Sequence, residues 1–119
     1  MFGWFRIEGF LMDLLDTSVI DDVRDALGDD AYLGFVRRML SEMRGLGPVL
    51  TGLQGDPEAL AQAAHRAAGS AVSVGASGLH GRLKAIEDSA RAGGDCSALV
   101  GGLDAEIDAT EAAIGALLA

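Results

Sequence analysis

Residues 57–92 read PEALAQAAHRAAGSAVSVGASGLHGRLKAIEDSARA, and the signals along this stretch decide the fold. Asp56 and Pro57 are a typical helix start, and Gly75 is a typical helix stop. Beyond the stop, apolar residues recur at helical spacing at Leu79, Leu83, Ile86 and Ala90. The pattern predicts two helices, over residues 57–74 and 77–92, that form an antiparallel hairpin turning near Gly75 and Ala76.

The same helical periodicity continues on both sides of the hairpin. Upstream it covers residues 19–27 and a longer segment over residues 32–53, which we expect to bend near Gly45 to Pro48. Downstream it covers residues 99–117. No stretch alternates between apolar and polar residues as a strand does. The sequence therefore predicts an all-α fold, an antiparallel four-helix bundle with a short N-terminal helical extension.

The first twelve residues, MFGWFRIEGFLM, are apolar but include Arg6 and Glu8. These charges, and the lack of a small-residue cleavage site, distinguish the segment from a signal peptide and from a membrane span. We therefore expect residues 1–12 to be an N-terminal extension or helix and residues 13–119 to form the bundle.

Length and charge narrow the possible functions. A chain of 119 residues is expected to form one domain around a single core. Its 18 acidic and nine basic residues give a net charge of -9, which disfavours nucleic acid and anionic membranes as partners. The single cysteine, Cys96, cannot form an internal disulfide, which fits a reducing, cytoplasmic setting. Arginine outnumbers lysine eight to one, which suggests a GC-rich bacterial genome.

His65 lies in an unusual stretch, AHRAAGSAVSVGASGL at residues 64–79. Apart from His65, Arg66 and Leu79, this stretch contains only Ala, Gly, Ser and Val. Glycine inside a helix costs about 1 kcal/mol relative to alanine, so Gly69 indicates that something approaches the helix closely. On a helical wheel at about 100° per residue, His65 points roughly 150° away from the inward face. That predicted inward face consists of Leu60, Ala63, Ala64, Ala67, Ala71 and Val74, and the expected partner-docking residues are Ala61, Ala68, Gly69 and Val72.

Several roles are conceivable for His65, and a solvated surface histidine is one of them. A metal site would need more ligands than His80 and Cys96 offer from their places in the sequence. A Ser–His–acid triad would need a strained nucleophile turn, for which the sequence has no signature. The remaining chemistry is an imidazole nucleophile that attacks a group delivered by another protein.

The residues around His65 match a set of family spacings. The set has an alanine before the histidine, Gly-Ser four and five residues after it, and Gly-Ala ten and eleven residues after it. A leucine follows the Gly-Ala pair, and an acidic or amide residue follows the leucine. By these spacings the sequence resembles the histidine-containing phosphotransfer (HPt) domain family. The matching residues are Ala64, His65, Gly69, Ser70, Gly75, Ala76, Leu79 and Glu87. The upstream LGDDAYLGFVRRML, residues 27–40, is also similar to the family's second helix, so the resemblance extends from about residue 13 to the C-terminus.

The resemblance implies roles for particular side chains. Glu87 would accept a hydrogen bond from Nδ1 of His65 and leave Nε2 as the phosphorylated nucleophile. The hairpin is compatible with this, since residues whose numbers add up to about 151 lie level with one another. An exposed carboxylate that pairs only with Lys84 or Arg91 is the alternative for Glu87. The family usually has a basic residue where this chain has Ala68, so we expect Lys84 or Arg91 to neutralise the phosphoryl oxygens instead.

The resemblance also implies a function and its partners. We expect a phosphotransfer protein of a multistep two-component phosphorelay, which accepts a phosphoryl group from a receiver-domain aspartate or a kinase and passes it to another receiver. The partners would be receiver domains of response regulators and hybrid histidine kinases. The sequence has no glycine-rich nucleotide site, so we expect a phosphocarrier without ATP-dependent kinase activity of its own. We also expect the domain to be a monomer without a cofactor, because the Mg²⁺ would belong to the receiver. A helical adaptor that binds a receiver or kinase without transfer is the alternative, motivated by Ala68.

Overall fold

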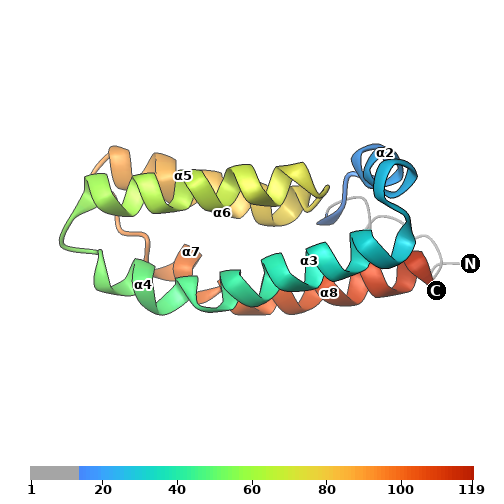
Figure 1. Ribbon diagram of the computed structural model, residues 1–119. Helices are drawn as coiled ribbons and strands as arrows, with labels where there is room; N and C mark the ends of the chain where they lie inside the picture. Colours follow the sequence, from blue (N-terminus) through green and yellow to red (C-terminus); the bar gives the residue numbers. More distant parts are fainter. Residues whose placement is uncertain (1–13) are drawn as a thin grey trace, which may run out of the picture.

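The computed structural model describes residues 14–119, and the regular structure in that range is entirely helical (Figure 1). The predicted all-α class is therefore confirmed. None of the described helices is both long and apolar enough to cross a membrane. The extension predicted for residues 1–12 lies outside the described residues. The helices are α2 (Thr17–Leu27), α3 (Asp29–Arg44), α4 (Leu46–Gly52), α5 (Pro57–Ser73), α6 (Ser77–Arg91), α7 (Ser97–Gly101) and α8 (Leu103–Leu118).

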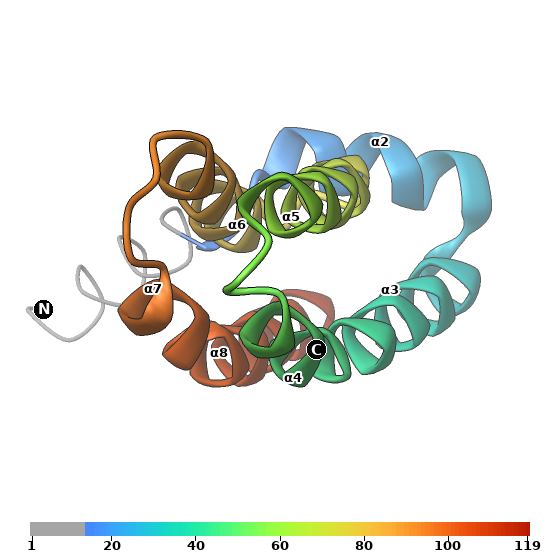
Figure 2. The same cartoon turned by 90° about the vertical axis from the view of Figure 1, so that its left-hand side faces the viewer.

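The helices form two layers, which Figures 1 and 2 show from directions 90° apart. α5 and α6 lie side by side in one layer, as the hairpin predicts. α3 and α8 lie along the other layer, where α4 follows α3 and α7 precedes α8. α2 lies at the end of the molecule where α5 turns into α6. The hairpin that carries His65 therefore forms one outer layer of the protein.

Aspartate side chains cap the first turns of α2 and α5, and the cap of α5 is the start signal that the sequence predicts at Asp56. Asp16 accepts hydrogen bonds from the backbone N–H groups of Ser18 and Val19 at 3.2 and 3.3 Å. Asp56 accepts one from the N–H of Ala59 at 3.2 Å. These caps satisfy N–H groups that have no partner within the helix, so they fix where α2 and α5 begin.

Glycines divide two of the predicted helices. The segment predicted over residues 32–53 breaks at Gly45 into α3 and α4, so the expected bend is present. The segment predicted over residues 99–117 breaks at Gly102 into α7 and α8, and the apolar periodicity of the sequence did not indicate this break. A Cβ at Gly102 would lie 2.5 Å from the Arg82 guanidinium. Glycine therefore gives Arg82 the room to donate to the carbonyl of Leu99 at 2.9 Å.

The turn between α5 and α6 is held from two other helices. Gly75 has φ +81°, and a Cβ there would lie 2.6 Å from Cγ1 of Ile20 on α2. The Asp16 N–H donates to the carbonyl of Gly75 at 2.8 Å. The buried Tyr32 hydroxyl of α3 donates to the carbonyl of Val74, also at 2.8 Å. These contacts fix the turn, and with it the register of the hairpin.

α5 is rotated about its axis relative to the predicted wheel. Ala63 and Ala67, which we expected to face inward, are only half-buried. Ala61 and Ala68, which we expected to face a partner, are 0% and 3% exposed. The predicted inward face was therefore wrong by roughly 60° on the wheel. The physical reason is close packing against α6, because α5 buries the alanines that face that helix: Leu60, Ala61, Ala64, Ala68 and Ala71 are its buried residues.

Candidate functional site

His65 and Glu87 meet across the α5–α6 hairpin. Nδ1 of His65 lies 3.1 Å from both Oε1 and Oε2 of Glu87. The His65 side chain is 66% exposed, whereas that of Glu87 is 5% exposed. The contact that the family resemblance implies is therefore present, and it joins a solvent-facing imidazole to a buried carboxylate.

Glu87 is ionised because cationic and donor side chains surround it. Burial by itself raises the pKa of this carboxyl, but hydrogen bonds from His65, Arg91 and Lys84 outweigh burial and lower the pKa from 4.5 to about 2. Nζ of Lys84 lies 3.3 Å from Oε1, and Nε of Arg91 lies 3.2 Å from Oε2. At neutral pH the buried group is therefore a carboxylate that only accepts hydrogen bonds.

The carboxylate determines which imidazole nitrogen carries the proton. Since Glu87 can only accept, Nδ1 of His65 must be the donor. In the neutral ring the lone pair then belongs to Nε2, on the opposite edge of the imidazole. The site thus presents an exposed ring whose nucleophilic nitrogen points away from the buried carboxylate.

Lys84 and Arg91 lie on either side of Glu87 along α6, and both side chains are about half exposed. Arg91 also pairs with Glu58 of α5 at 3.5 Å, and Lys84 with Asp88 at 3.6 Å. The structure therefore places both expected cations against the Glu87 carboxylate. Two cations and three carboxylates give this cluster a formal charge of -1 (2 − 3).

The surface of α5 next to His65 is open at two of the four predicted docking residues. A Cβ at Gly69 would meet no atom within 4 Å, and Val72 is 45% exposed. Ala61 and Ala68 are in the core, so their predicted docking role was wrong. The rotation of α5 toward α6 explains both results.

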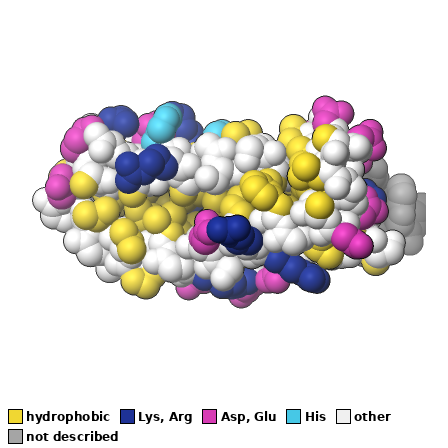
Figure 3. Space-filling view, viewed as in Figure 1, with side chains coloured by type: hydrophobic (Ala, Val, Ile, Leu, Met, Phe, Trp, Pro, Cys, Tyr) yellow, Lys and Arg dark blue, Asp and Glu magenta, His cyan; other side chains and the backbone are white. Residues whose placement is uncertain are grey.

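Two contacts near the site were not predicted from the sequence. One is the pairing of Glu58 with Arg91. The other joins His80 to α5: Nδ1 of His80 donates to the carbonyl of Ala68 at 3.1 Å. In Figure 3 the histidines lie along the edge formed by α5 and α6, with Lys and Arg side chains nearby. Within residues 14–119, no three His, Cys, Asp or Glu side chains gather as a metal site would require.

Comparison with known families agrees with this geometry. The model of the Hpt domain matches residues 17–113, a range that includes both His65 and Glu87. The chain belongs to the Hpt domain family. Hpt domains carry out histidine phosphotransfer in two-component phosphorelays and interact there with receiver domains and kinases. No curated protein and no solved structure matches the chain.

Proposed function

We propose that His65 is the phosphoryl acceptor of this Hpt domain and that Nε2 is its reacting atom. The observation that carries the proposal is the contact of Nδ1 with both oxygens of the ionised Glu87. A ring held by its Nδ1–H keeps the Nε2 lone pair available, and the 66% exposure of the side chain lets a protein partner reach it.

The proposed reaction is a reversible displacement at phosphorus. The Nε2 lone pair of His65 attacks the phosphorus of an aspartyl phosphate on a receiver domain. The N–P bond forms as the P–O bond to the aspartate breaks, and the bonding electron pair leaves with the aspartate carboxylate. Attack by the carboxylate of another receiver reverses these changes, so the domain passes on a phosphoryl group without consuming a nucleotide.

Glu87 acts in this scheme as a positioning residue. Phosphorylation at Nε2 leaves the Nδ1 proton on the ring, so the ring gains positive charge. The carboxylate at 3.1 Å stabilises that charge and keeps the ring oriented. Because the three surrounding donors hold its pKa at about 2, Glu87 keeps its negative charge and leaves the proton on the ring.

Lys84 and Arg91 are the proposed source of positive charge for the phosphoryl oxygens. A phosphoryl group adds roughly 1.5 to 2 negative charges to a cluster that already has a formal charge of -1. Both cations lie within 3.3 Å of the carboxylate next to His65, so a change of rotamer can redirect either side chain. Lys84 has its two acidic partners on its own helix, whereas Arg91 is also tied to Glu58 across the hairpin.

A receiver domain would dock over the open part of α5. Gly69 and Val72 extend this surface from His65 along the helix, and Gly69 leaves space for the approaching backbone. Magnesium would be held by the receiver. We place this phosphotransfer in the cytoplasm of a bacterium, in accord with the single cysteine and the arginine-rich composition, and we expect the domain to act as a monomer.

The test is incubation with receiver domains from the source genome that have been phosphorylated with acetyl phosphate and Mg²⁺. The domain should gain a label that is labile in acid and stable in base, as expected for phosphohistidine, while His65→Gln should remain unlabelled. A stable complex with a receiver, formed without any label on the wild-type domain, would contradict transfer and support the adaptor function.

A further inference from the structure

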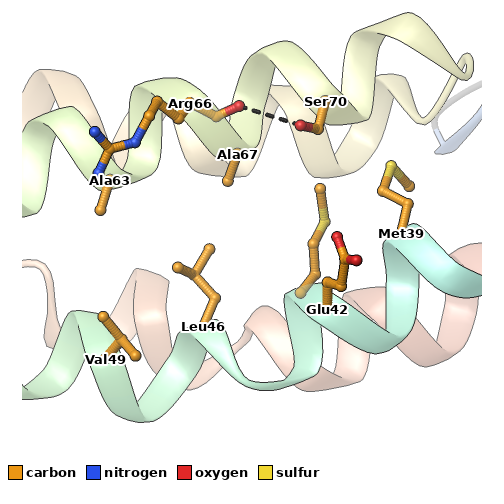
Figure 4. Close-up of a pocket in the computed structure, with 9 residues that line it drawn as sticks. Met39, Glu42, Leu46, Val49, Ala63, Arg66, Ala67 and Ser70 are labelled. Carbon is orange, nitrogen blue, oxygen red and sulfur yellow. Dashed lines mark hydrogen bonds between the residues drawn. The ribbon is translucent and has the colours of Figure 1, made fainter.

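The polar contacts that hold α5 come from the side of α6. On the opposite side an open groove of about 310 Å³ separates α5 from α3 and α4 (Figure 4). Ala63 and Ala67 of α5 face larger side chains across this groove, among them Met39 and Leu46. In the part of the chain that the structure describes, three polar side-chain contacts join α5 to another helix, and all three go to α6. The position of α5 therefore depends on what α6 contributes.

His80 makes the contact that lies closest to the turn of the hairpin. Nδ1 of His80 lies 3.1 Å from the carbonyl oxygen of Ala68. The other two contacts join side chain to side chain, so His80 alone of the three reaches the backbone of α5. A carbonyl oxygen can only accept, so the Nδ1 of this ring carries the proton. The half-buried ring of His80 thus makes a directed hydrogen bond across the hairpin.

The peptide group that His80 contacts leads directly to His65. The carbonyl of Ala68 and the N–H of Gly69 belong to the same peptide group. Because α5 is an α-helix here, that N–H donates to the carbonyl four residues earlier, which is the carbonyl of His65 itself. A chain of two hydrogen bonds therefore connects the His80 ring, through one peptide group, to the backbone of His65. Hydrogen bonds linked in this way polarise and strengthen one another.

This chain of hydrogen bonds passes through a glycine in the interior of α5. Glycine leaves the backbone more conformational freedom than any other residue, so Gly69 is where the helix is least restrained. Gly69 also belongs to the open surface over which we place the receiver, about 40° from His65 around the helix. A bond from His80 to the adjoining carbonyl restricts the backbone without adding a side chain to that surface. His80 therefore supplies rigidity at a position where a larger residue would block the partner.

We propose that His80 is a positioning residue for phosphotransfer, and that it holds the backbone of His65 and Gly69 in the orientation that a docked receiver requires. The proposal rests on the phosphotransfer function proposed above. Glu87 orients the imidazole of His65, and His80 orients the stretch of helix that carries this imidazole. Loss of the bond from His80 leaves the nucleophile intact but displaces it relative to the receiver, and small displacements of reacting atoms slow a reaction strongly.

The test compares two replacements of similar shape, His80→Asn and His80→Leu. Asparagine keeps an N–H donor near the place of Nδ1, whereas leucine has the same branching and no donor. In single-turnover transfer from a saturating phosphorylated receiver, His80→Leu should be about threefold to tenfold slower than the wild type, the range for a lost neutral hydrogen bond. His80→Asn should keep most of the wild-type rate. Equal rates in all three proteins would overturn the proposal, and so would equal losses in the two variants.

A matched control on the same helix separates positioning from stability. Arg82 also donates to a backbone carbonyl, that of Leu99 at 2.9 Å, but this bond leads to the other layer of the protein. Arg82→Met should therefore lower the melting temperature and still transfer at the wild-type rate. Hydrogen exchange at the Gly69 amide, followed by NMR, should become faster in His80→Leu and stay unchanged in Arg82→Met. If both variants slow transfer equally, the loss reflects stability alone and the role of His80 is wrong.

A small-molecule donor distinguishes this proposal from the function on which it rests. Phosphoramidate transfers its phosphoryl group to Nε2 of His65 with release of ammonia, and it needs no docking surface. Its rate should be equal in the wild type, His80→Asn and His80→Leu. A loss with phosphoramidate as large as the loss with the receiver would mean that His80 acts on the ring itself, which would overturn its role toward the receiver. Wild-type protein that neither donor labels would contradict the phosphotransfer function.

Discussion

The two flanks of α5 differ in packing and in chemistry. Toward α6 the helix buries Ala61, Ala64 and Ala68, and polar groups cross the hairpin only in specific pairs such as His65 with Glu87. Toward α3 and α4 it leaves Ala63 and Ala67 half-exposed beside a groove that has both apolar and charged lining residues. The same small residue thus has opposite uses on one helix. On one flank alanine allows the close packing that fixes the reacting ring, and on the other it leaves space for a partner.

The side of α5 that faces α6 is the closed flank, and the side that faces α3 and α4 is the open flank. The chemical step requires precise atomic positions, whereas the binding of a partner must be reversible. Phosphoryl transfer depends on the position of one nitrogen atom, Nε2 of His65. The closed flank fixes that position through the buried Glu87 carboxylate and through the α5–α6 turn, which the Tyr32 hydroxyl holds in place. A relay protein must also release each partner, and a groove that remains open in the free domain allows exchange. Variants on the two flanks should therefore have different effects, and the following measurements compare them.

The largest effect is expected for His65→Gln. This change should abolish phosphorylation, because the other histidine, His80, has its Nδ1 on the backbone carbonyl of Ala68 and not on a carboxylate. Melting temperature and helical circular dichroism should change little, since an exposed side chain contributes little packing. Incorporation of label into wild type and variant, measured with the same phosphorylated receiver, decides the outcome. Equal labelling would remove His65 as the acceptor.

Gly69→Phe should have the next largest effect. The new side chain would point into open space, so it should not disturb the fold and should improve the helix propensity by up to about 1 kcal/mol. It would also hold the receiver away from Nε2, and a displacement of about 1 Å at the reacting atoms can cost about a hundredfold in rate. Stopped-flow transfer from a receiver, with phosphoramidate as the control donor, measures this loss. Normal transfer by the variant would mean that partners do not approach over Gly69.

Lys84→Ala and Arg91→Ala test whether the closed flank supplies the positive charge. Loss of the operative cation should slow transfer about tenfold or more, since a hydrogen bond to a charged group is worth roughly 1.5 to 3 kcal/mol. The single and double variants should be compared by transfer rate and by the lifetime of phosphohistidine. If all three transfer phosphate as fast as the wild type, the receiver must supply the charge itself.

The sequence predicted the closed flank better than the open one, for physical reasons. The partnership of His65 and Glu87 follows from a hairpin whose turn is fixed by Gly75, which needs a positive φ and has no room for a Cβ. The rotation of α5 could not be predicted, because its alanines fit either flank equally well. The apolar spacing of Phe35 and Met39 likewise gives the same pattern for a closed core and for the wall of a groove.

Glu87 should give the closed flank a characteristic dependence on pH. Its pKa is about 2 in the folded protein and ordinarily 4.5. The stabilisation from the ionised carboxylate is therefore fully present above pH 4.5 and is lost as the pH falls toward 2. Melting temperatures across that range should fall more steeply for the wild type than for Glu87→Gln, which lacks the titrating group. Parallel curves would mean that the carboxyl gains nothing from its partners on folding.

The smallest effects are expected when one alanine on each flank of α5 is replaced by leucine. The two changes add the same volume and differ in the space that each flank offers to it. Ala64 is fully buried toward α6, so Ala64→Leu should overpack the core and cost about 1 to 3 kcal/mol of unfolding free energy. Ala67 lines the groove, so Ala67→Leu should change that free energy by no more than about 0.5 kcal/mol. Leucine and alanine have similar helix propensities, which makes the two changes comparable.

Denaturant unfolding of both variants measures the difference in unfolding free energy. Equal losses would show that α5 packs against α3 in solution and that the groove is closed. A neutral Ala67→Leu that slows transfer from a receiver would instead show that the added side chain occupies space that the partner needs.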